Sequence, residues 1–110
     1  MIDKIKAIVE QLNILEAERL KQEGYKAFFN TDNTLTDSVK VTFLEKPKYF
    51  YINFGTSGAF MIAKEEVKGF PIGSIFNIKG YGTPNFNKCY GTINEIDIKK
   101  LHSLRWDYRR

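Results

Sequence analysis

The amino-acid sequence predicts a small α+β domain in which an N-terminal amphipathic helix packs on an antiparallel meander sheet of four to six strands. The chain of 110 residues fits one domain and leaves no room for a second independent core. Apolar residues first recur at steps of three and four, which is the period of an amphipathic helix. After Gly24 the period changes to two, and turn-forming residues separate the apolar runs, as in consecutive β-hairpins. We therefore expect residues 1–110 to form a single domain.

The first predicted element is a helix over residues 3–23. Its apolar stripe is formed by Ile5, Ile8, Val9, Leu12 and Leu15. Asp3 is expected to cap the N-terminus of the helix, and Gly24 is expected to end it in the left-handed conformation that glycine adopts readily. Glu16 and Arg19, three residues apart, are expected to form an ion pair on the solvent-exposed side of this helix.

Six short segments after the helix have the composition or the alternation of strands. They are residues 25–29, 38–45, 49–54, 59–63, 74–79 and 90–93. In the third segment, Phe50, Ile52 and Phe54 share one face, which is expected to receive the helix, and tyrosines occupy the other face. Residues 64–73 and 80–88 are rich in glycine, proline or other turn-forming residues, and they are expected to be connections.

A central segment resembles a known group of proteins. Residues 58–62 (Gly-Ala-Phe-Met-Ile), residues 75–82 (Ile-Phe-Asn-Ile-Lys-Gly-Tyr-Gly) and the Asn-Lys pair at 87–88 are similar to short uncharacterised proteins of bacteriophages and related mobile elements. The resemblance covers roughly residues 49–91. It implies a β-hairpin and an origin in a mobile element, and it implies no activity. The sequence departs from the pattern at residues 64–74, where a longer loop replaces a tight turn.

The composition also indicates a cellular compartment. Cys89 is the only cysteine, so no intramolecular disulfide can form, as is typical of proteins in a reducing compartment. The first residues carry charges where a signal peptide would have its apolar segment. No uncharged apolar run approaches the ~20 residues that cross a bilayer. We expect a cytoplasmic protein without membrane contact.

Few side chains are suited to catalysis. The only histidine, His102, lies among basic residues and is expected to be a polar surface residue with no carboxylate to orient it. Cys89 is expected to be a small strand residue rather than a nucleophile. One histidine and one cysteine cannot complete a structural zinc site, which needs four ligands. We therefore expect a protein without enzymatic activity, cofactor or metal.

The C-terminal region carries most of the net charge. Residues 97–110 hold five basic and two acidic residues, while the whole chain has a net charge of +4. A short basic helix, capped by Asp97 and reaching Arg105, is expected here. Arginines among aromatic rings suit nucleic acid, because guanidinium groups meet phosphates and rings stack on bases. The expected binding residues are Lys99, Lys100, Arg105, Trp106, Tyr108, Arg109 and Arg110, with Tyr49, Tyr51 and Tyr81 as a further stacking surface on the sheet.

Two interpretations of function follow. The first is a non-enzymatic accessory module that contacts nucleic acid through the basic, aromatic C-terminal tail, residues 97–110. The second is a phage or mobile-element protein that binds a host protein machine and inhibits or adapts it. The tail itself also has a simpler interpretation, in which Trp106 and Tyr108 pack on the core while the charges remain solvated. Assembly with identical copies is a further kind of partner that the sequence leaves open.

Overall fold

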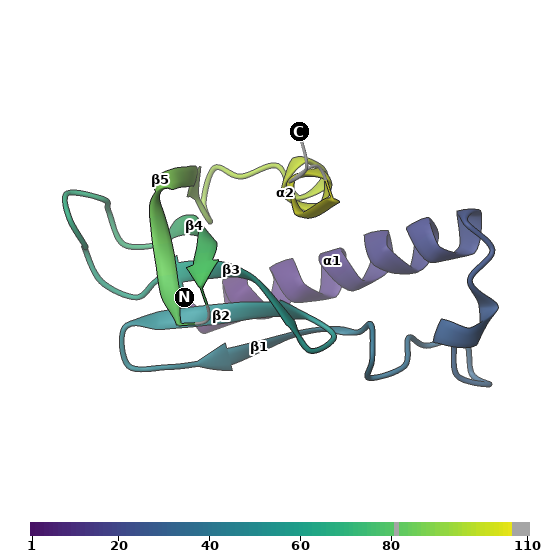
Figure 1. Cartoon of the computed structure of the whole chain (residues 1–110). Helices are drawn as coiled ribbons and strands as arrows, with labels where there is room; N and C mark the ends of the chain where they lie inside the picture. Colours follow the sequence, from purple (N-terminus) through teal and green to yellow (C-terminus); the bar gives the residue numbers. More distant parts are fainter. Residues whose placement is uncertain (81, 107–110) are drawn as a thin grey trace.

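The predicted fold class is confirmed. The computed structural model describes residues 1–80 and 82–106, with the backbone alone at Trp106. The elements are α1 (Ile2–Gln22), a 3-10 helix η1 (Lys26–Phe28), β1 (Val41–Glu45), β2 (Tyr49–Phe54), β3 (Ser57–Ala63), β4 (Ser74–Gly80), β5 (Thr83–Thr92) and α2 (Ile98–Trp106). Within the described residues, the five strands form one antiparallel sheet in the order β1-β2-β3-β4-β5 (Figure 1). This order is the meander that the alternating segments predict.

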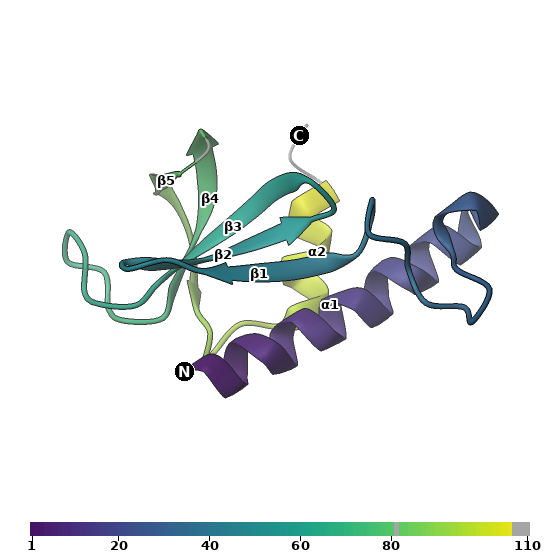
Figure 2. The ribbon, with the colours of Figure 1, turned by 90° about the horizontal axis from the view of Figure 1, so that it is seen from below.

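Both helices lie on the same face of the sheet (Figure 2). The core contains Ile5, Ile8 and Leu12 of α1 together with Phe50, Ile52 and Phe54 of β2. The stripe of the helix therefore meets the phenylalanine face of the strand, as predicted. Leu101 of α2 is fully buried in the same cluster, so α2 shares the core that α1 covers.

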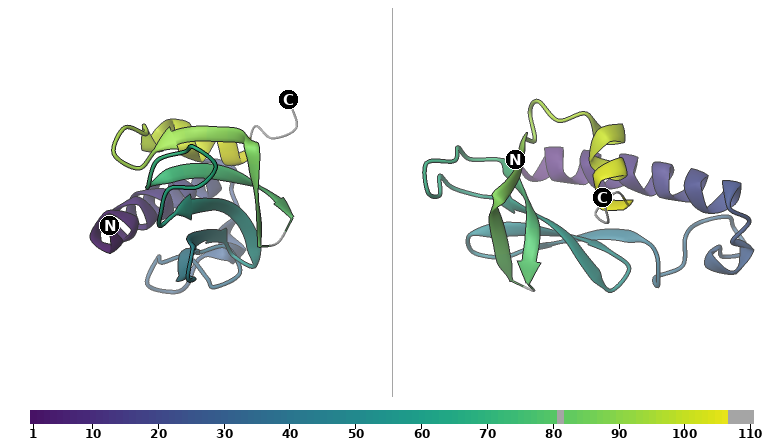
Figure 3. Two further views of the ribbon diagram at one scale, coloured as in Figure 1. Left: turned by 90° about the vertical axis from the view of Figure 1, so that its left-hand side faces the viewer. Right: turned by 45° about the horizontal axis from the view of Figure 1, so that its top comes forward.

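The sheet bends sharply between β3 and β4. These strands pair over residues 60–62 of β3 only, and the β4–β5 hairpin crosses the direction of β1, β2 and β3 (Figures 1 and 3). Phe76 faces away from the helices and is nevertheless fully buried. The rings of Phe70 and Phe86 cover it, with centroids 5.1 and 5.2 Å from its own. The loop over residues 64–73 thus closes a second, smaller apolar cluster.

The boundaries of α1 differ slightly from those predicted for the helix. Met1 is the N-cap residue and no side chain caps the helix, so the prediction that Asp3 is the cap is wrong. Asp3 lies in the first turn, where a negative charge still interacts favourably with the helix dipole. Gly24 follows the helix at φ 78°, as predicted. No helix in the described part of the chain is long and apolar enough to cross a membrane.

The prediction of a strand at residues 25–29 is wrong. Lys26–Phe28 form a 3-10 helix, and Phe29 pairs only with Leu35 in an isolated bridge. The polar turn that follows closes on itself, because Asp32 accepts hydrogen bonds from the backbone and the hydroxyl of Thr34. These local hydrogen bonds satisfy the backbone without a neighbouring strand.

The last strand is longer than residues 90–93. Gly82, at φ 80°, lies in the turn after β4, and β5 already begins at Thr83. Pro84 lies within β5 opposite Ile78, although proline cannot donate to a strand ladder. Three register shifts interrupt the β4–β5 pairing, and such bulges accommodate residues that a regular strand excludes.

Replacing Ile8 by Ala should lower the free energy of unfolding by about 2–5 kcal/mol, because it opens a cavity in the core. Ile8 is 4% exposed and Ile14, on the same helix, is 54% exposed. Ile14→Ala is therefore the matched control and should change stability by no more than about 0.5 kcal/mol. Urea unfolding of both variants tests the burial pattern, and equal losses would contradict it.

Candidate functional site

The position of α2 depends on one buried carboxylate. Glu16 of α1 is only 2% exposed, and its Oε1 accepts a hydrogen bond of 2.9 Å from Arg19 Nε while its Oε2 accepts one of 3.2 Å from Nη2. Arg19 also donates to Glu23 over 2.9 Å. The predicted ion pair exists, but its expected place on the solvent-exposed side is wrong. Glu16 continues the four-residue spacing of Ile8 and Leu12 toward Leu20, and this is the sequence signal for its burial.

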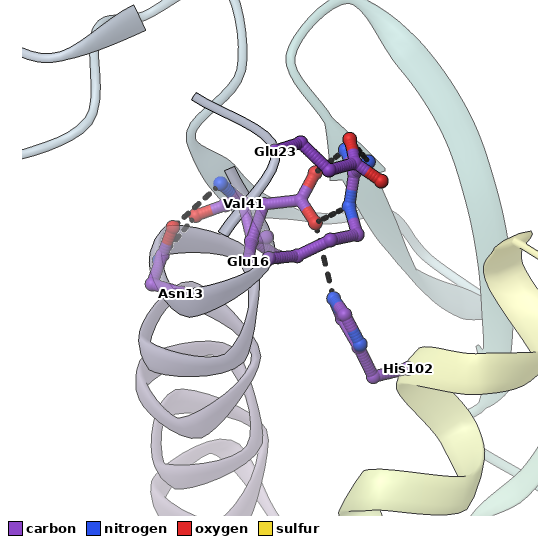
Figure 4. A network of polar contacts seen from close by, with 6 residues as sticks. Asn13, Glu16, Glu23, Val41 and His102 are labelled. Carbon is purple, nitrogen blue, oxygen red and sulfur yellow. Dashed lines mark hydrogen bonds and ion pairs between the residues drawn. The ribbon is translucent and has the colours of Figure 1, made fainter. Parts of the chain in front are cut away.

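His102 of α2 completes this group. Its Nε2 lies 3.0 Å from Glu16 Oε1 (Figure 4), and its side chain is 13% exposed. Because an ionised carboxylate only accepts hydrogen bonds, Nε2 is the donor. The expectation of a surface histidine without a carboxylate is therefore wrong. The physical reason is that α2 packs across α1 and turns His102 toward the acid.

Opposing effects set the pKa of Glu16. Burial acts to raise the pKa, but hydrogen bonds from His102 and Arg19, with their positive charge, outweigh burial and hold the pKa below its ordinary value. The hydrogen bond to Glu16 is also the main cause that raises the pKa of Arg19. A buried carboxylate with such partners remains ionised and links the two helices.

These contacts describe a structural link between the helices. Both oxygens of Glu16 are occupied. The hollow beside it has a volume of 380 Å³; its charged lining residues are Glu16, Arg19, Glu23 and Arg105, and His102 does not line it. We call this space the α1–α2 hollow. Its two carboxylates balance its two guanidinium groups. Across the described residues, no group of three or more His, Cys, Asp or Glu side chains is placed to hold a metal ion.

Helix α1 also covers part of the free edge of the sheet, at the start of β1. Asn13 Nδ2 donates to the carbonyl of Val41 over 2.9 Å, and the Val41 N–H donates to Asn13 Oδ1 over 2.8 Å (Figure 4). The side-chain amide therefore makes the pair of hydrogen bonds that another strand would make at the start of β1. This contact fixes the middle of α1 on the sheet next to Glu16.

The basic residues of α2 differ in their surroundings. Asp97 Oδ1 accepts a hydrogen bond of 3.0 Å from the Lys99 N–H, so Asp97 caps α2 as predicted. Lys99 and Lys100 are both exposed. Lys99 lines a hollow together with Glu18 and Asp97, whereas Lys100 lies outside it, about 100° further round the helix. The charge of Lys100 is therefore the less balanced of the two.

Arg105 lies against the body of the protein. Its guanidinium carbon is 5.5 Å from the centre of the Phe54 ring, a distance at which cation–π attraction is effective. The side chain of Trp106 and the residues Tyr108, Arg109 and Arg110 lie outside the described residues. Their predicted role in binding therefore stays a prediction.

The predicted tyrosines are on the other face of the sheet. Tyr49 and Tyr51 alternate with the core residues of β2, so they face away from α1 and α2, and both are half-buried. Burial is the main cause that raises the pKa of Tyr49, with the charge of Glu65 adding to it. Tyr81 lies outside the described residues. Tyr49 and Tyr51 therefore do not share one surface with Lys99 and Lys100.

A second hollow lies between α2 and the β4–β5 hairpin. Its volume is 270 Å³, and it is lined by Gly58, Ala59, Phe60, Asn77, Ile78, Lys88, Tyr90, Leu104 and Arg105. We call it the β5–α2 hollow. Two of its residues, Lys88 and Arg105, are cationic, and among the described residues no acidic side chain lines it. Of these nine, the sequence singled out only Arg105 for binding. Asn77 shares a face of β4 with the buried Ile75, and that polar residue on an inner face was the available signal.

No protein-family model matches the chain, and neither the curated protein sequences nor the solved structures contain a significant match to it. The function proposed below therefore rests on the residues and contacts of this chain.

Replacing Glu16 by Gln should lower the free energy of unfolding by about 1–3 kcal/mol near neutral pH, because a neutral amide replaces the ionised acceptor of a buried network. The pKa of Glu16 is lowered in the folded protein from an ordinary value of 4.5. Its carboxylate therefore stabilises the fold fully above that pH, and this contribution is lost as the pH falls through the folded-state pKa.

The free energy of unfolding of the wild type, measured in urea, should accordingly fall more between about pH 6 and about pH 3 than that of Glu16→Gln, which lacks the titrating group. The matched control is Glu18→Gln on the exposed side of α1, which should resemble the wild type at every pH. An identical pH dependence of Glu16→Gln and the wild type would contradict the linkage.

Proposed function

We propose that this protein is a non-enzymatic accessory module that binds nucleic acid through α2 and the basic segment that follows it. The observation that carries the proposal is the orientation of α2. Leu101 and His102 are turned toward the core and α1, so Lys99, Lys100 and Ser103 are turned to solvent. Cations held on a helix anchored in this way can meet phosphates without first ordering the backbone.

The distribution of charge in the sequence supports the same proposal. Most of the net charge of +4 belongs to residues 97–110, and phosphate contacts by lysine and arginine supply most of the sequence-independent affinity of a protein for nucleic acid. Arg105, near the other end of α2, lines the β5–α2 hollow. The support for the proposal is thus the grouping of cations rather than the total charge.

The alternative, a protein that binds a host machine, has less support from the surface. Large apolar side chains that the described residues expose are Met1, Ile2, Ile14, Tyr25, Leu44 and Ile72. They belong to the start and the middle of α1, the segment after it, β1 and the loop between β3 and β4. A large contiguous apolar patch is one mark of a protein interface. A stoichiometric protein partner that survives nuclease treatment of a host lysate would favour this alternative.

The test is a titration of short single- and double-stranded DNA and RNA by fluorescence anisotropy at low and moderate salt. We expect affinity to fall as salt rises, because binding releases counterions. Lys100→Gln should weaken binding to every sequence and lower the salt slope by about 1, as expected for one lost phosphate contact.

Lys99→Gln is a graded comparison rather than a neutral control, since it removes the same charge from the same helix but from a position beside Glu18 and Asp97. Its effect should be clearly smaller. The proposal fails if the wild type shows no salt-sensitive binding at low ionic strength.

A further inference from the structure

Several polar side chains that line the β5–α2 hollow can donate hydrogen bonds. Asn77 Oδ1 accepts a hydrogen bond of 2.7 Å from the N–H of Ile78, so its oxygen is already used. Tyr90 lines the same hollow, and its hydroxyl can donate a hydrogen bond. Lys88 and Arg105 carry only donors.

The geometry points to this hollow as a binding site for a phosphate oxyanion, supplied by the backbone of the nucleic acid bound in the function proposed above. Phosphate oxygens accept hydrogen bonds and carry negative charge, and the ammonium of Lys88, the guanidinium of Arg105 and the hydroxyl of Tyr90 can all donate to them. A cation would find no carboxylate among the described lining residues. The donor set therefore selects an anion.

The shape and the walls of the hollow suit a small anionic group. Its volume of 270 Å³ is below the ~300–1,000 Å³ of pockets that enclose larger organic ligands. Ala59, Phe60, Ile78 and Leu104 supply apolar wall beside the polar groups. Burial is also the main cause that raises the pKa of Tyr90, which keeps its hydroxyl protonated and able to donate.

One feature opposes anion binding. Leu104 and Arg105 belong to the last turn of α2, and the C-terminal end of a helix carries partial negative charge. This partial charge is smaller than the full positive charge of Lys88. The balance of charge at the hollow is therefore positive.

The site can be tested by comparing two lysines. Lys88→Gln should weaken oligonucleotide binding about tenfold, because it removes a charge-assisted contact to a phosphate. Lys48→Gln removes the same charge from the exposed β1–β2 turn and should weaken binding no more than about twofold. Arg105→Lys keeps the charge but loses the planar fork of donors, and it should also weaken binding while leaving the folded state intact. Urea unfolding of each variant separates binding from stability.

Side-chain amide signals in nitrogen-15 NMR spectra give a second, direct measurement. On addition of a short oligonucleotide, and separately of inorganic phosphate, the Asn77 amide should shift. The Asn13 amide, which is fixed on Val41, should not.

Three outcomes distinguish the two proposals. Equal binding by Lys88→Gln and Lys48→Gln, with no shift of Asn77, would overturn the phosphate site while leaving nucleic-acid binding in place. A shift of Asn77 with inorganic phosphate, but no binding of oligonucleotide, would overturn the proposed function and assign the hollow to free phosphate. Weak binding by Lys88→Gln together with an Asn77 shift by oligonucleotide would support both.

Discussion

The arrangement of this protein depends on the burial of one ionised carboxylate. Glu16 occupies a position in the apolar stripe of α1, and the free energy lost by removing its charge from water is offset only if partners surround it. Arg19 supplies two hydrogen bonds from the same helix, and His102 supplies one from a residue 86 positions away. This contact, together with the burial of Leu101, holds α2 across α1 at this place. Lys99, Lys100 and Arg105, the predicted binding residues of α2 within the described part, take their positions from this contact.

The two faces of the sheet are stabilised differently. The face toward the helices has a continuous apolar core, whereas on the opposite face the rings of Phe70, Phe76 and Phe86 meet where the sheet bends. Lys68, with its Nζ 4.6 Å from the centre of the Phe86 ring, covers the edge of this second cluster. The long loop after β3, which departs from a tight turn, has a packing role that explains its length. Tyr49 and Tyr51 lie beyond it on β2, on the face away from α2.

The sequence predicted the elements whose residues repeat regularly, and it did so for a physical reason. A helical or strand period records which side of an element is buried. The sequence therefore predicted α1, β2 and the packing of the apolar stripe of α1 on one face of β2. The contact of Glu16 with His102 could not be predicted in this way, because neither period specifies which distant residue satisfies a buried charge. The strand at residues 25–29 failed because local hydrogen bonds of a polar turn competed successfully with the sheet. The β5–α2 hollow was missed because its residues come from four separate elements.

The division of charge around α2 follows from the same contact. Glu16 and Glu23 lie on the α1 side of the helix, where they face Arg19 and balance the arginines of the α1–α2 hollow. The other side faces β5, whose Lys88 brings a further positive charge, and no described acid lines the space between them. Arg105 lines both hollows. A helix of nine residues thus separates a hollow that holds two carboxylates from one whose described lining residues include none.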